Sequence, residues 1–103
     1  MSRGPDAGAL LVRALYRDSC CAGCPLEIIE ADWVRWASVT FTGARHRMQW
    51  TGHASPALDA WLAALPRADL PIRGHLLADI TVAGLTHRAD SVKIEIEALT
   101  LEQ

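Results

Sequence analysis

Three cysteines lie close together in the first quarter of the chain, at Cys20, Cys21 and Cys24. Cys21 and Cys24 have the C-x-x-C spacing that lets two thiolates bind one metal ion or close a redox-active disulfide. A structural zinc site needs four ligands, and the sequence has no second C-x-x-C pair. The cluster is therefore compatible with three roles: packing in the core, zinc binding, or thiol redox chemistry.

Zinc binding by these cysteines would need ligands from elsewhere in the chain. The four histidines are His46, His53, His75 and His87. None lies three to five residues from another, so the histidine half of a zinc finger is missing. A thioredoxin-like site normally opens a helix after a strand, whereas here a helix is expected before the cysteines and Pro25 follows them. We expect no cofactor, with zinc as the alternative.

Arginine and tryptophan side chains gather in residues 33–53, a segment without a single acidic residue. The candidate interaction residues are Trp33, Trp36, Arg45, Arg47 and Trp50. Arginines beside aromatic rings can hold single-stranded nucleic acid, but this basic footprint is small and the formal net charge is −2. We therefore expect a solvated face whose arginines pair with Glu95 or Glu97, and not a nucleic-acid site.

Trp33 and Trp36 cannot both face one core if they lie on the same strand, because side chains alternate across a strand. One of them is then exposed or buried against a partner, and tryptophan is enriched at the centres of protein interfaces. This pattern predicts a non-enzymatic interaction domain, either a homodimer or a binder of another protein. The first hairpin would supply the contact, and a metal-binding or redox module built on the cysteines is the alternative.

Acid–base catalysis has less support in the sequence. Glu27, Glu30 and Asp32 lie close together, but without a pocket the sequence places no carboxylate within hydrogen-bond reach of a histidine. We therefore assign no catalytic residue. A small enzyme or ligand-binding protein would need a pocket between helix and sheet. The histidines expected to line such a pocket are His46, His53 and His75.

The composition fits one globular domain over residues 1–103, with residues 1–6 as a flexible terminus. Half of the 103 residues are hydrophobic and 21% are charged, which excludes a disordered chain. The apolar stretch 9–12 is soon interrupted by Arg13 and Arg17, so it is too short for a signal peptide or a membrane span. Three neighbouring cysteines do not suit a secreted disulfide framework, and we expect a cytoplasmic protein without membrane contact.

Two helices are expected. The first covers residues 7 to about 16, with Asp6 as its N-cap, and should end near residue 18 or 19. The second begins at Ser55 and Pro56, the preferred N-cap and first helical residue, and Pro66 ends it. The apolar stripes are Leu11, Ala14 and Leu15 in the first helix and Leu58, Trp61, Leu62 and Leu65 in the second.

Alternating side chains predict four main strands, at residues 33–42, 45–51, 76–85 and 91–101. A short fifth strand is expected at 26–30, where one helical turn is the alternative. Gly43-Ala44 predicts the turn of the first hairpin, and residues 87–90 the turn of the second. The side chains expected to share a face within each strand are Ala37, Val39 and Phe41; His46, Met48 and Trp50; Leu76, Ala78, Ile80 and Val82; and Val92, Ile94, Ile96 and Ala98.

The expected element order is α-(β)-β-β-α-β-β. It predicts an α+β fold with a single antiparallel sheet of four to five strands and two helices packed on one face. Such a sheet keeps an exposed edge and an exposed face, through which it can dimerise.

Overall fold

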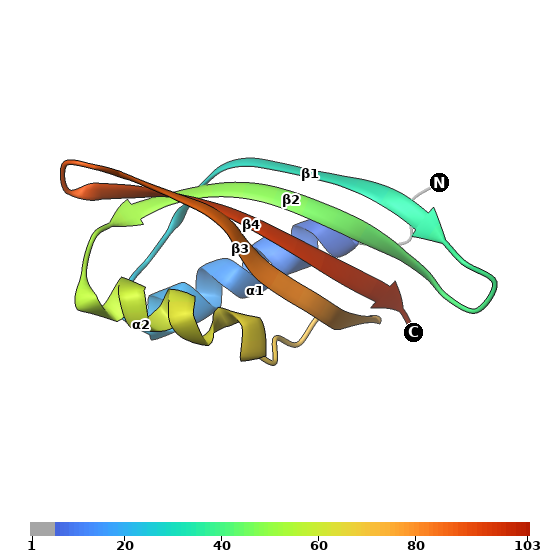
Figure 1. Ribbon diagram of the computed structural model, residues 1–103. Helices are drawn as coiled ribbons and strands as arrows, with labels where there is room; N and C mark the ends of the chain where they lie inside the picture. Colours follow the sequence, from blue (N-terminus) through green and yellow to red (C-terminus); the bar gives the residue numbers. More distant parts are fainter. Residues whose placement is uncertain (1–5) are drawn as a thin grey trace.

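The computed structural model describes residues 6–103, and both of its helices lie on the same side of one sheet (Figure 1). The expected flexible terminus falls mostly on residues 1–5, outside the described part. The sheet is antiparallel, has four strands and follows the order β1-β2-β4-β3. The α+β class and the element order are thereby confirmed.

Helix α1 (Ala7–Cys21) begins as expected but runs about one turn further. The Asp6 carboxylate accepts a hydrogen bond from the Ala9 N–H at 2.7 Å. At the other end, the Gly23 and Cys24 N–H groups donate to the carbonyls of Cys20 and Ser19. Gly23 adopts φ 82°, the left-handed conformation that commonly terminates helices. The predicted end near residue 18 or 19 was therefore too early, and Cys20 and Cys21 belong to the last helical turn.

Strand β1 (Glu27–Ala37) is continuous, so the short strand expected at 26–30 and the following strand are one. A bulge between Ile28 and Glu30 interrupts the alternation of side chains along β1. The two segments therefore looked separate in the sequence. Strand β2 (Thr42–His53) pairs with β1 along its length. The described residues therefore form four strands and not five.

The turn of the first hairpin lies at Ser38–Phe41, and the expected turn at Gly43-Ala44 is wrong. The Ser38 N–H donates to the Phe41 carbonyl at 2.7 Å, and the Ser38 hydroxyl accepts from the Phe41 N–H at 3.0 Å. Gly43 is instead a strand residue, where a Cβ atom would collide with the Thr100 carbonyl oxygen of β4. As a consequence Val39 and Phe41, which were expected to share one strand face with Ala37, are exposed at the hairpin tip.

Helix α2 (Pro56–Ala64) begins where Ser55 and Pro56 predicted, and the 3-10 turn η1 (Leu65–Arg67) follows it. The Ser55 hydroxyl accepts a hydrogen bond from the Leu58 N–H at 3.0 Å. Trp61 packs in the core and its indole N–H donates to Asp18 of α1 at 2.8 Å. This bond ties the two helices together beneath the sheet.

Strands β3 (His75–Arg88) and β4 (Ser91–Glu102) form the second hairpin. Its turn is shorter than expected and contains only two residues, Ala89 and Asp90, with Ala89 at φ 54°. The alternation of β4 is confirmed, but β3 has bulges between Leu77 and Asp79 and between Val82 and Gly84. Because of the first bulge, Leu76 does not share a face with Ile80.

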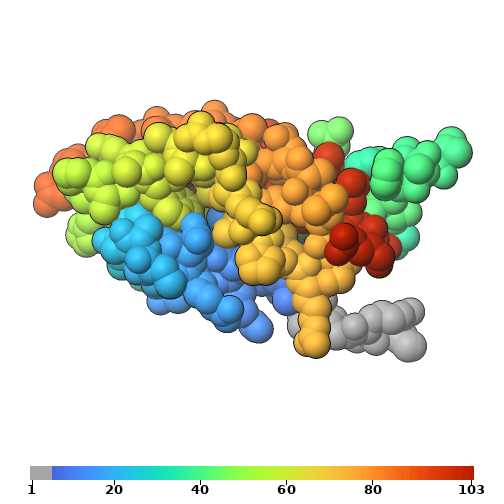
Figure 2. Space-filling model, turned by 90° about the horizontal axis from the view of Figure 1, so that it is seen from below, coloured from blue at the N-terminus to red at the C-terminus, as the bar shows by residue number. Residues whose placement is uncertain are grey.

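One face of the sheet and the helices enclose the core, while the opposite face, here called the open face, is not covered by either helix (Figure 1). Seen from the helix side, the β1–β2 hairpin and the end of β4 extend past both helices (Figure 2). No helix in residues 6–103 is both long enough and apolar enough to cross a membrane.

Candidate interaction surface

The open face is apolar at the end near the β1–β2 hairpin. The register aligns Val34, Arg45, Leu99 and Asp79 in one row across the four strands. The next row contains Trp36, Gly43, Leu101 and Leu76. We call the five apolar members of these rows the apolar end: Val34, Trp36, Leu76, Leu99 and Leu101.

Exposure differs among the side chains of the apolar end. Val34 and Leu76 are 62% and 51% exposed, whereas Trp36, Leu99 and Leu101 are half-buried. The Trp36 indole nitrogen is shielded from solvent and has no hydrogen-bond partner among the described residues. Trp36 lies opposite Gly43 of β2. Because glycine has no side chain, an aromatic ring on the neighbouring strand can lie over its backbone and shield it from solvent. The ring is therefore held against the sheet and keeps part of its surface free.

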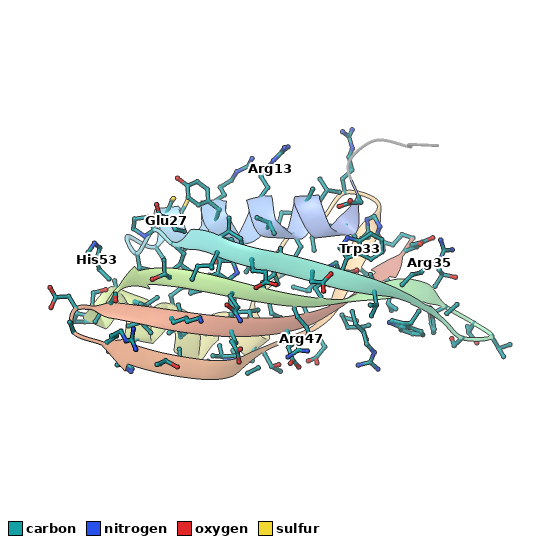
Figure 3. The ribbon with its side chains drawn as sticks, turned by 90° about the horizontal axis from the view of Figure 1, so that it is seen from above. Arg13, Glu27, Trp33, Arg35, Arg47 and His53 are labelled. Carbon is teal, nitrogen blue, oxygen red and sulfur yellow. The ribbon has the colours of Figure 1, made fainter. Side chains whose placement is uncertain are left out.

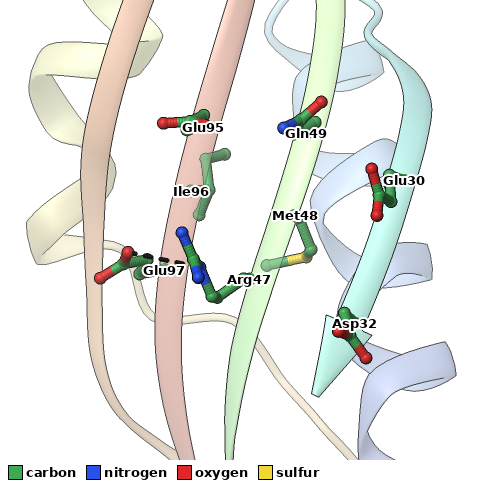
Figure 4. A pocket seen from close by; sticks show the side chains of 8 residues that line it. All are labelled: Glu30, Asp32, Arg47, Met48, Gln49, Glu95, Ile96 and Glu97. Carbon is green, nitrogen blue, oxygen red and sulfur yellow. Dashed lines mark ion pairs between the residues drawn. The ribbon is translucent and has the colours of Figure 1, made fainter.

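Charged side chains occupy the middle of the open face (Figure 4). Carboxylates from β1 and β4 surround a hollow of about 230 Å³ that also contains Arg47 and Gln49. Arg47 lies opposite Glu97 in the register, and the Arg47 Nε and Glu97 Oε2 atoms are 3.8 Å apart. This confirms the expected pairing of a hairpin arginine with the acidic strand. Both side chains are more than half exposed, so the pair contributes little stability.

Arg45 differs from Arg47, since its cross-strand neighbour is Leu99. A second, larger hollow of about 640 Å³ is lined by Val34, Arg45, Leu99 and Asp79, among others. The open face is thus concave between its charged middle and its apolar end. Arg45 and Asp79 place one positive and one negative charge beside the apolar side chains.

Trp33 lies on the helix side of β1 and is 44% exposed. It packs over the beginning of α1, where a Cβ atom on Gly8 would come within 2.9 Å of the indole ring. The prediction that Trp33 and Trp36 face opposite sides is confirmed by the register. Trp50 is fully buried in the core, so we leave it out of the candidate surface.

His46 is buried on the helix side of β2. Its Nε2 atom is 2.8 Å from the Thr100 hydroxyl. Burial lowers the pKa of the imidazole, an effect that His75 increases and that Asp6 opposes. Of the three histidines expected to line a helix–sheet pocket, only His46 lines the groove of about 610 Å³ between α1 and β1. Neither His53 nor His75 contributes to that groove.

The three cysteines stand in different environments. Cys20 and Cys21 are exposed at the end of α1, whereas Cys24 is buried and packs in the core. Burial, with smaller effects of Asp18 and Cys20, raises the pKa of the Cys24 thiol and disfavours the thiolate. Within residues 6–103, no three histidine, cysteine or acidic side chains are arranged to hold a metal ion. The zinc and redox roles stay predictions.

Sequence reasoning missed four members of the apolar end, namely Val34, Leu76, Leu99 and Leu101. The alternation of β4 contained a signal, because Leu99 and Leu101 continue the series of Lys93, Glu95 and Glu97 on the open face. Leu76 could not be found in this way, since the bulge next to it changes its face.

Comparison of this chain with protein-family models, with curated proteins and with solved structures gave no match. The candidate surface therefore rests on the geometry of the open face alone.

Proposed function

We propose that the protein is a non-enzymatic domain that forms a homodimer by stacking the open faces of two copies. The apolar end is the observation that carries this proposal: large apolar side chains of β1, β3 and β4 meet on a face that neither helix covers. Burial of apolar surface drives association, and contiguous exposed apolar patches mark interaction sites. Trp36 would be the largest apolar side chain in the contact.

The strand order makes the open face complementary to itself. In a two-fold stack whose axis runs along the strands, β1 lies over β3 of the partner subunit and β2 lies over β4. Trp36 then lies over Leu76 of the partner subunit. In the charged middle, Arg47 lies over Glu97 of the partner subunit, so opposite charges meet. These matches favour a second copy over an unrelated partner.

Two exposed leucines of β3 provide a matched test of the apolar contact. Leu76 belongs to the apolar end and is 51% exposed, while Leu85 is 47% exposed and pairs with Ile94 on the helix side. Leu76→Ala should weaken dimerisation by about tenfold, and Leu85→Ala should leave it unchanged. Sedimentation equilibrium measures both, with reductant present because Cys20 and Cys21 are exposed. A wild-type chain that stays monomeric at the highest concentration reached would overturn the proposal.

A charge exchange tests the geometry of the stack. In this arrangement Arg45 lies one strand away from Asp79 of the partner subunit. Arg45→Asp and Asp79→Arg should each weaken the dimer, because each places like charges near one another. The double variant should recover most of the wild-type affinity. If it is as weak as the single variants, the two-fold stack along the strands is wrong.

A further inference from the structure

The outer edge of β1 and helix α1 form a groove that the proposed dimer does not use. Within residues 6–103, no strand pairs with this edge, and α1 runs along and beyond it when the molecule is seen from the open face (Figure 3). The groove of about 610 Å³ lies between Val12 and Tyr16 of α1 and Ile28, Ala31 and Trp33 of β1. Its walls are mainly apolar, as in sites that accept alternate side chains of an added strand.

The backbone of β1 presents hydrogen-bonding groups to this groove. The Trp33 N–H does not point toward β2, because it donates to the Asp32 carboxylate at 2.9 Å. Alternate residues of an antiparallel strand share this orientation, so Ala31 and Arg35 also direct their N–H groups outward. The Asp32 oxygen occupies the position that a carbonyl oxygen of an incoming strand would take.

The edge lacks several of the features that commonly prevent strand addition. Residues 30–37 contain no proline and no lysine, and the bulge of β1 lies before Glu30. Proteins normally protect exposed edges by such residues or by bulges. An edge left regular over this length, beside an apolar groove, is suited to accept an extended segment.

A second copy of β1 does not fit this edge. Because α1 extends past β1, pairing of two β1 edges would bring two α1 helices into the same space beneath the joint (Figure 3). Packed helices need axes about 8–10 Å apart, whereas paired strands are only about 4.8 Å apart. A single extended peptide carries no such helix and avoids the conflict.

The charges beside the groove define the chemistry of the peptide. Glu27, Glu30 and Asp32 stand on the open side of β1, opposite the apolar groove side. Glu27 and Glu30 lie opposite the uncharged Thr51 and Gln49, and Arg47, which lies opposite Asp32, is paired with Glu97. Successive side chains of an added strand point to opposite faces. The matching sequence therefore alternates apolar residues for the groove with basic residues for the carboxylates.

We propose that the α1–β1 groove binds an extended peptide segment of another protein, with alternating apolar and basic residues, as an additional strand on β1. The probe is a fluorescein-labelled hexapeptide of alternating valine and lysine, and binding is followed by fluorescence anisotropy and by amide chemical shifts. The shifts should concentrate at residues 30–35 and on the groove side of α1. A peptide of alternating valine and glutamate should bind at least about tenfold more weakly.

Variants of the groove and of the edge test the mode of binding. Ala9→Glu places a carboxylate in the groove at an exposed helical position, and Ala63→Glu makes the same change on the exposed side of α2. Ala31→Pro removes an outward N–H without removing a bond to β2, as proline on edge strands does. We expect Ala9→Glu and Ala31→Pro to lose at least about tenfold in affinity, and Ala63→Glu to bind like the wild type.

Two outcomes would overturn the proposal. One is absence of binding of the valine–lysine peptide to the wild-type chain. The other is equal binding to the Ala9→Glu and Ala63→Glu variants, because the peptide would then lie elsewhere. If Ala31→Pro fails to fold, Ala9→Glu alone decides the result. Dimerisation is measured separately on the open face, so failure of one proposal leaves the other intact.

Discussion

The two faces of the sheet hold tryptophans in opposite situations. On the helix side, Trp50 has no exposed surface and is surrounded by the core. On the open face, Trp36 is half-buried against the sheet and belongs to the uncovered apolar end. The same residue type therefore serves folding on one face and is available for association on the other. This difference shows that the function of an aromatic residue here depends on the face, which the strand register determines.

The largest effect is expected from removing the buried ring. Trp50→Ala should lower the free energy of unfolding by about 3–5 kcal/mol, because a cavity replaces a large packed side chain. Urea denaturation of the monomer measures this loss. A change below about 1 kcal/mol would show that the helix side of the sheet is not the main core.

Trp36→Ala tests the other side of the comparison. Dimer affinity should fall by at least about tenfold, since the ring would be the largest apolar side chain in the contact, while the monomer loses only about 1 kcal/mol of stability. Sedimentation equilibrium and urea denaturation separate the two effects. If the dimer of this variant is as strong as that of the wild type, the open face is not the contact.

The protonation of His46 should make the helix side sensitive to acid. Burial lowers the pKa of His46 in the folded state, so the unfolded chain binds the proton first as the pH falls below the ordinary value of about 6.5. Stability should therefore be full above this pH and decrease below it, toward the lowered pKa of the folded state. Melting temperatures at about pH 7.5 and pH 5.5 measure the loss. His46→Gln keeps a polar group beside Thr100 and should melt with a smaller difference between the two pH values.

The smallest effect is expected from the charged middle of the open face. Arg47→Ala removes the ion pair with Glu97, and because both side chains are well exposed the free energy of unfolding should change by less than about 1 kcal/mol. Urea denaturation at low protein concentration measures the change in the monomer. A loss above about 2 kcal/mol would mean that this row contributes to folding and not only to the surface.

Much of the fold could be predicted from local signals. Ser55 and Pro56 determine the start of α2 by their own hydrogen-bonding and conformational preferences, and the alternation of β4 assigns its faces correctly. The turn of the first hairpin could not be predicted, because Gly43 resembles a turn residue. It is a glycine for another reason, the close approach of the β4 backbone at Thr100.

The candidate site was predicted in part, and the missing part depends on tertiary structure. Alternation along one strand identified Trp36, but the apolar end also needs Leu76 and Leu101 from two other strands. Neighbours across strands depend on the register, and the bulge beside Leu76 changes that register. One sequence does not specify where a strand accommodates an extra residue.

The hydrogen bond from the Trp33 N–H to Asp32 has a consequence for selectivity. While the carboxylate occupies this donor, a strand that approaches the edge finds one of its outward N–H groups already bonded. A guest strand has to displace the carboxylate and leave it without its donor. A guest with a lysine or arginine at the adjacent position gives the released carboxylate a new partner. In the proposed peptide complex, Asp32 would therefore favour cationic strands over neutral ones.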